Sequence, residues 1–175
     1  TQLNMRTQAR EHLKKNGYEH YELLNYAKAG FQSKHNLLYW ANQDYLGLGP
    51  GAFSYVNGRR FRGSASYERY LSKIGKDDWT PDEEEVLDAE AKETESFLLA
   101  LRLTRGAERS RFSGYEARRG GSLRALAEKG LLSIDEKVIR LTARGQFLAE
   151  TVFVELCEGR TSGIRNGILY SMRNE

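Results

Sequence analysis

The feature that most constrains the fold is a helical pattern that passes directly into a strand pattern near the start of the chain. Leu3, Ala9 and Leu13 lie on one stripe of a predicted helix that ends at Gly17, a residue typical of helix C-termini. The following residues, 18–24, are rich in aromatic side chains and predict a strand. A helix followed at once by a strand is the repeating unit of α/β folds, so we expect the last part of such a fold here.

The last third of the chain follows a different order. Residues 123–129 predict a helix closed by Gly130, and residues 131–134 and 138–141 predict two strands. Thr142 predicts the cap of a final helix that reaches about Cys157. A helix, a two-stranded wing and a further helix follow one another in winged-helix domains.

The middle of the chain carries three local signals. Asn57-Gly58 predicts a hairpin between strands 53–56 and 59–61, because a type I′ turn needs positive φ at both central residues. Residues 66–74 predict a short helix that ends at Gly75. Thr80-Pro81-Asp82-Glu83 predicts the N-terminus of a helix that continues to Leu103, because it combines an N-cap hydroxyl, a proline at the first position and a capping-box Glu.

Composition indicates a soluble globular protein. The chain has 175 residues, of which 39% are hydrophobic and 29% are charged. No apolar run approaches the roughly 18 residues that span a bilayer, and the first residues do not resemble a signal peptide, so we expect a cytoplasmic protein that is not integral to a membrane. Its single cysteine, Cys157, excludes an internal disulfide and an iron–sulfur cluster held by this chain alone.

The formal net charge of +3 is too balanced to argue for nucleic acid, but the charges are unevenly distributed. Residues 102–124 hold seven arginines and two acids, whereas residues 82–95 hold eight acids and one lysine. These runs are either solvated faces of neighbouring elements or, for the arginines, a site for an acidic ligand such as a propionate or phosphate.

Residues 35–42 predict a helix of about two turns that could hold a ligand. On it His35 and Tyr39 are four residues apart and share one side, and Asn36 and Trp40 form a second pair beside them. Imidazole is the commonest axial ligand of heme iron, and an indole can stack on a flat macrocycle. The alternative is a hydrogen-bonded histidine packed among aromatic side chains.

A glycine-spaced run follows, with short strands expected over 45–48 and 52–56. It contains Gly47, Gly49, Gly51 and Ala52, yet it is neither a dinucleotide fingerprint nor a P-loop. The glycines serve either a tight strand end or a close approach of backbone amides to a ligand.

Three segments together resemble one family. GYEHYELLNYA over 17–27, HNLLYW over 35–40 and DYLGLGPGAFS over 44–54 are similar to the radical SAM family of oxygen-independent coproporphyrinogen III oxidase and related heme chaperones. The resemblance implies an α/β plus α+β chain, in which residues 1–63 are the C-terminal portion of a partial radical SAM (β/α) barrel. Residues 64–175 would form a helical, winged-helix-like C-terminal domain that packs over the barrel opening. The family's three-cysteine cluster motif is absent, so we expect the C-terminal half of such a protein, without its N-terminal barrel.

The resemblance also implies site residues. The HNxxYW pattern is associated with heme binding in the chaperone branch, which makes His35 the candidate heme ligand with Asn36, Tyr39 and Trp40 as its setting. The run that contains Gly47, Gly49, Gly51 and Ala52 resembles the segment near bound S-adenosylmethionine. Phe53 and Leu24 stand where the family usually has His and Ser, which puts any polar role at these two positions in doubt.

The expected function is heme binding and transfer to acceptor proteins. The alternative in the intact protein is oxidative decarboxylation of coproporphyrinogen III, which needs S-adenosylmethionine and a 4Fe-4S cluster that this chain alone cannot hold. A winged-helix nucleic-acid-binding module is a further alternative, weakly supported by eight basic and seven acidic residues over 122–175, and we expect no nucleic acid partner. The last possibility is a domain that only shields the barrel and fixes a partner.

Overall fold

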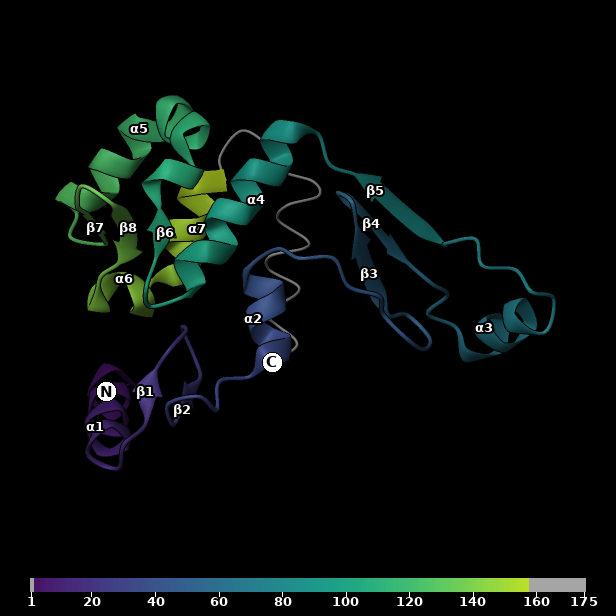
Figure 1. Cartoon of the computed structure of the whole chain (residues 1–175), viewed down its shortest axis with the longest axis horizontal. Helices are drawn as coiled ribbons and strands as arrows, with labels where there is room; N and C mark the ends of the chain where they lie inside the picture. The colour runs from purple at the N-terminus through teal and green to yellow at the C-terminus, as the bar shows by residue number, and fades with distance from the viewer. Residues whose placement is uncertain (1, 158–175) are drawn as a thin grey trace.

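The computed structural model describes residues 2–157, with side chains from residue 4. Figure 1 shows a helix with a two-stranded ribbon at the N-terminus, a three-stranded sheet extended outward by α3, and a cluster of helices around a second three-stranded sheet. The helices are α1 (Gln2–Lys15), α2 (Lys34–Trp40), α3 (Tyr67–Ile74), α4 (Ala89–Arg102), the 3-10 turn η1 (Arg109–Arg111), α5 (Ser113–Glu128), α6 (Ala143–Phe147) and α7 (Ala149–Cys157). The strands are β1 (Glu19–His20), β2 (Tyr26–Ala27), β3 (Phe53–Val56), β4 (Arg59–Arg62), β5 (Glu83–Val86), β6 (Ala107–Glu108), β7 (Leu132–Ile134) and β8 (Val138–Leu141).

The main core lies in the C-terminal cluster, where α4, α5 and α7 pack beside the antiparallel sheet β6-β8-β7. Phe97 of α4 stacks on Tyr115 of α5 with ring centroids 4.2 Å apart. The hydroxyl of Tyr115 donates to the carbonyl oxygen of Leu156 in α7 at 3.1 Å, which satisfies its one buried polar atom. These contacts join three helices that are far apart in sequence into one core.

The predicted hairpin is confirmed. Asn57 and Gly58 have φ values of 52° and 81°, and β3 pairs with β4 in the register Val56↔Arg59. The predicted helix at 66–74 is also confirmed as α3, because Ser66 accepts the amide of Arg69 at 3.3 Å and the helix ends at Gly75. The two wing strands appear as β7 and β8, and Thr142 caps α6 as expected.

The helix predicted from Thr80 to Leu103 is wrong over its first part. Residues 83–86 form β5, which pairs antiparallel with β4, and α4 begins only after Asp88, whose side chain accepts the amide of Ala91. The glutamates of β5 meet the arginines of β4 in cross-strand ion pairs: Arg59 with Glu84 at 2.6 Å, Arg60 with Glu85 at 3.3 Å, and Arg62 with Glu83. These pairs favour strand over helix at a segment whose local sequence favours a helix start.

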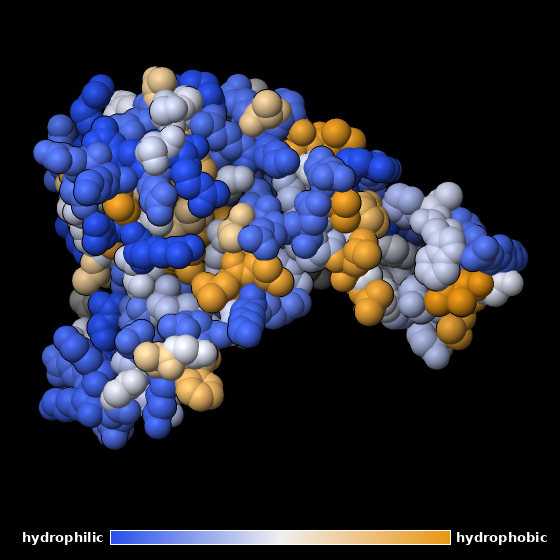
Figure 2. Space-filling model, in the orientation of Figure 1, coloured by the Kyte–Doolittle hydropathy of each residue, from blue (hydrophilic) through white to orange (hydrophobic). Residues whose placement is uncertain are grey.

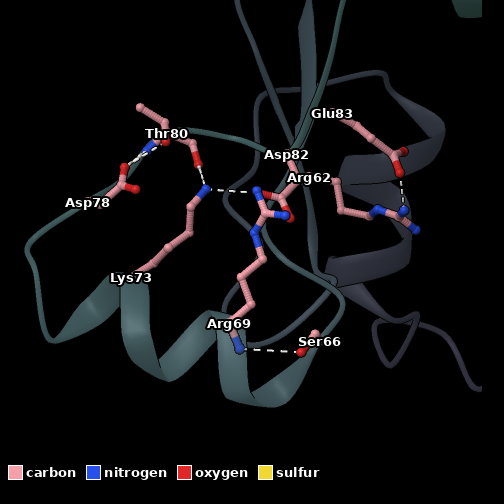
Figure 3. A network of polar contacts seen from close by, with 8 residues as sticks. All are labelled: Arg62, Ser66, Arg69, Lys73, Asp78, Thr80, Asp82 and Glu83. Carbon is pink, nitrogen blue, oxygen red and sulfur yellow. Dashed lines mark hydrogen bonds and ion pairs between the residues drawn. The ribbon is translucent and has the colours of Figure 1, made fainter.

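A second set of contacts holds Thr80 away from a cap position (Figure 3). Its hydroxyl donates to Asp78 at 2.6 Å, and its carbonyl oxygen accepts from the ammonium of Lys73 at 2.6 Å. Lys73 also donates to Asp82 at 2.8 Å. The network ties α3 to the segment that enters β5, so that α3 and the sheet form one arm.

The arm carries exposed apolar side chains at its outer end, around α3 (Figure 2). The exposed residues there are Tyr67, Leu71, Ile74 and Trp79. No residue of α3 is buried by the described residues. No described helix is both long and apolar enough to cross a membrane.

Several other predicted elements differ in extent. The strand at 18–24 shrinks to β1, which pairs antiparallel with β2, and the strand at 45–48 is only a bridge between Tyr45 and Tyr55. Helix α5 begins ten residues before the predicted start, because three glycines at 114, 120 and 121 hide its pattern. The helix after Thr142 breaks at Leu148 into α6 and α7. All paired strands among the described residues are antiparallel, so the parallel barrel strands stay a prediction.

Candidate functional site

The helix that carries the candidate heme ligand is confirmed as α2, one residue earlier than expected. Ser33 caps it by accepting the amide of Asn36 at 3.2 Å. Its inner side, formed by Leu37 and Trp40, packs on Leu99 of α4 and on Leu103, the residue that follows α4. Trp40 is only 2% exposed. Apolar burial of this side therefore fixes α2 on the C-terminal cluster.

Trp40 also stacks on a buried arginine. The guanidinium carbon of Arg102 lies 3.8 Å from the ring centroid of Trp40, and the same guanidinium is 3.7 Å from a carboxylate oxygen of Glu22. The other oxygen of Glu22 accepts the amides of Leu24, at 3.0 Å, and Asn25. This triad of Glu22, Arg102 and Trp40 joins the segment after β1 to α2 and α4. Sequence reasoning missed it, because Arg102 stood only as one member of a basic run.

His35 lies on the opposite, exposed side of α2. Its ring meets that of Tyr39 edge to face, with centroids 4.6 Å apart, and Tyr39 meets Tyr45 in the same way at 4.5 Å. No hydrogen bond from residues 4–157 reaches either ring nitrogen of His35. Aromatic contacts thus surround part of the imidazole, and these residues leave its nitrogens available to bind a metal ion.

Tyr45 rests in turn on a buried polar cluster. Its ring stacks at 6.3 Å on Tyr55, and the two residues exchange backbone hydrogen bonds of 2.7 and 2.9 Å. Beneath them Arg60 forms an ion pair with Glu95 of α4. Burial raises the pKa of Tyr45 and, against the neighbouring Arg60 charge, also that of Glu95. The ring contacts that run from His35 through Tyr39 and Tyr45 to Tyr55 therefore end beside a buried ion pair.

The glycine-spaced run leads away from Tyr45 and closes against β3. A Cβ on Gly47 would lie 2.2 Å from the carbonyl oxygen of Phe53, and the amide of Gly47 donates to the Ser54 hydroxyl at 3.0 Å. Gly51 has a φ of 69° and donates to the carbonyl oxygen of Ser64, at 2.7 Å. The first of the two alternatives, a tight strand end, thus accounts for these two glycines.

The other two positions of that run differ. The amide of Ala52 donates to the carbonyl oxygen of Gly49 at 3.3 Å, so it is used within the loop. Gly49 has nothing within 4 Å of its Cβ position. Three of the four amides are therefore engaged, and contact of this run with S-adenosylmethionine stays a prediction.

The structure brings some predicted residues together and separates others. His35 and Tyr39 are in contact and connect, through Tyr45, to the start of the glycine-spaced run. Trp40 faces α4 instead, and Asn36 is half-buried between the two sides of the helix. Residues 2–157 place no three His, Cys, Asp or Glu side chains around a possible metal ion.

Leu24 and Phe53, the two positions that depart from the family pattern, have different surroundings. Leu24 is exposed, and the guanidinium of Arg62 lies 5.2 Å from the ring centroid of Phe53.

Some arginines of the basic run over 102–124 are paired with neighbouring acids. Arg109 forms an ion pair with Glu116, and Arg118 contacts Glu93 at 2.6 Å and Glu90 at 3.5 Å. Together with Arg102, three of the seven arginines are held by carboxylates. Part of the positive charge that the sequence offered to an acidic ligand is therefore used inside the fold.

Comparison with known proteins agrees with the pattern of motifs. Heme chaperone HemW of Bacillus subtilis is 38% identical over 143 residues, which cover 78% of this chain and 38% of that protein. This chain is homologous to part of the heme chaperone HemW. The HemW of Lactococcus lactis is 35% identical over 150 residues, which are 81% of this chain and 38% of the relative. The chain thus spans less than two fifths of the length of these HemW relatives. No family model matches it.

A solved structure supports the fold. Coproporphyrinogen III oxidase (HemN) from Escherichia coli, described as a radical SAM enzyme, superposes with a TM-score of 0.69 over 88% of this chain and 40% of that one. The sequence identity is 18%, so this likeness concerns the fold of mixed helices and sheets.

Proposed function

We propose that this chain is the heme-binding part of a HemW-like heme chaperone and that His35 is the axial ligand of the iron. The observation that carries the proposal is the exposed imidazole of His35, whose nitrogens take no hydrogen bond from residues 4–157 and whose ring contacts that of Tyr39 edge to face. An axial ligand must be within reach of the heme, and the exposed His35 side chain meets that condition. The HemW relatives supply the class of cargo.

The role of the chain's own residues follows from this geometry. His35 would bind heme iron through one ring nitrogen, while Tyr39 and Tyr45 limit rotation of the ring. Trp40 would hold α2 in place from the inner side. Delivery of heme to acceptor proteins needs a reversible bond, and a single ligand on an exposed helix favours exchange over permanent capture.

The test is a titration of the purified chain with ferric heme, followed by absorbance. We expect wild type to shift the Soret band with saturation, and His35→Ala to lose that shift. His12→Ala is the matched control, because His12 is also exposed on a helix but lies outside the motif. Equal spectra for wild type and His35→Ala would remove His35 as the ligand.

The intact protein would also carry the remaining radical SAM parts. S-adenosylmethionine and a 4Fe-4S cluster are implied by the relatives, but one cysteine cannot hold that cluster, which needs about four thiolate ligands or an equivalent set. Decarboxylation of coproporphyrinogen III is therefore an alternative for the full-length protein only. Turnover of coproporphyrinogen by full-length protein would favour it over the chaperone function.

We also propose that the C-terminal cluster is winged-helix-like. Its order α4, β6, α5, β7, β8 and its sheet order β6-β8-β7 suit that fold. The division of the chain at residue 63 is a proposal as well, and the pairing of β4 with β5 crosses it.

A further inference from the structure

The exposed side of α2 has a composition of its own. Lys34, His35 and Leu38 lie one, three and four residues apart, so they share one side of the helix, which we call the outer face of α2. Leu38 is 43% exposed, and Phe31, two residues before the cap, is 81% exposed. An imidazole is thus flanked by apolar surface and by a cation.

The charged residues around the outer face are all basic. Residues 28–43 contain two lysines and no aspartate or glutamate. Neither Lys28 nor Lys34 forms an ion pair with a residue whose side chain is described. By contrast, the cations of the sheet arm and of the 102–124 run are repeatedly paired with carboxylates, as with Arg62, Lys73 and Arg118.

We infer that the outer face of α2 selects porphyrins that carry carboxylate side chains, with Leu38 against the macrocycle and Lys34 beside a propionate. The inference rests on the proposed function of His35. Heme is a flat apolar ring with two carboxylates at one edge, and the outer face of α2 offers a ligand, an apolar contact and an unpaired cation in matching order. The Lys34 side chain is long and flexible enough to reach the edge of a porphyrin whose iron is bound by the neighbouring His35.

Lys34, rather than an arginine of the 102–124 run, is then the candidate partner of a propionate. The arginines over 102–124 were the sequence candidates for a propionate, but two of them, Arg109 and Arg118, are paired with acids of the fold. Lys34 is adjacent to the candidate iron ligand and has no competing carboxylate among the residues whose side chains are described. A cation next to His35 is better placed to contact a propionate of a heme bound there than arginines on other elements are.

The experiment compares ferric heme with its dimethyl ester, which lacks the carboxylate charges. Both are titrated into purified protein from the same dilute detergent. We expect Lys34→Gln to weaken heme binding about two- to fivefold, the effect of one exposed ion pair, and to leave binding of the ester unchanged. Leu38→Ser should weaken both ligands alike, and the control Lys76→Gln, an exposed lysine beyond α3, should alter neither.

Salt gives a second readout. The difference between wild type and Lys34→Gln for heme should shrink as ionic strength rises, because the pair is exposed to screening. The inference is overturned if Lys34→Gln affects heme and ester equally, or neither. If wild type binds both porphyrins through His35 without this discrimination, only the role of Lys34 fails. If wild type binds neither, or His35→Ala leaves the spectra unchanged, the proposed function fails with it.

Discussion

Replacement of Arg102 by methionine should be among the most damaging single changes in the chain. The guanidinium is 1% exposed and lies 3.7 Å from the equally buried Glu22. At an effective dielectric constant of about 20, two unit charges at that distance attract by about 4.5 kcal/mol. Removing one partner leaves the other charge buried, and such changes cost about 3–5 kcal/mol. Met keeps an apolar stem but does not reach the position of the guanidinium, so the loss includes charge, stacking and some packing volume.

A double-mutant cycle separates these two contributions. Glu22→Gln keeps an oxygen for the amides of Leu24 and Asn25 but removes the charge. In that background Arg102→Met should cost only about 1–2 kcal/mol, the contribution of a desolvated cation–π contact with Trp40 and its packing.

The assay is urea unfolding followed by tryptophan fluorescence. Of the two tryptophans, Trp79 is largely exposed, so a spectral shift on unfolding reports chiefly the buried Trp40. An Arg102→Met penalty that is the same in the wild-type background and in the Glu22→Gln background would refute the ion pair as its cause.

Three further predictions concern separate features. Gly47→Ala should destabilise the protein by about 1–3 kcal/mol because its Cβ meets the Phe53 carbonyl, whereas Gly121→Ala, in a helix with open space, should stabilise it by about 0.5–1 kcal/mol; thermal unfolding of both checks the opposite signs. Burial lowers the pKa of His20, so the unfolded state binds its proton at higher pH than the folded state does. The free energy of unfolding should therefore fall as pH drops from 7 through about 6.5 and below. Over that pH range the urea midpoint of His20→Gln should fall less than that of wild type. Tyr45→Leu removes the ring behind Tyr39 and should broaden or shift the Soret band of the heme complex, while Tyr45→Phe should leave the band unchanged.

Signals confined to neighbouring residues were predicted well from the sequence. The turn at Asn57-Gly58 needs only two positive φ values, and the caps at Ser66 and Thr142 need only an amide three residues away. The segment that forms β5 was mispredicted, because its partners on β4 lie 21 to 25 residues earlier and outweigh a good local helix start. Local signals and distant partners compete at such segments, and here three cross-strand ion pairs decide the outcome.

The same distinction divides the HNLLYW motif. Helical spacing correctly placed His35 beside Tyr39, a contact within one turn. The spacing could not reveal that Trp40 is covered by Arg102, 62 residues later in the chain. Nor could it reveal that Arg102 is also paired with Glu22, which precedes the motif. Because a guanidinium already occupies one face of the indole and the ring is buried, Trp40 serves the site as the anchor of α2. The motif thus joins an exposed ligand to a buried anchor on one short helix, and loss of the anchor should reach heme binding only through the stability of α2.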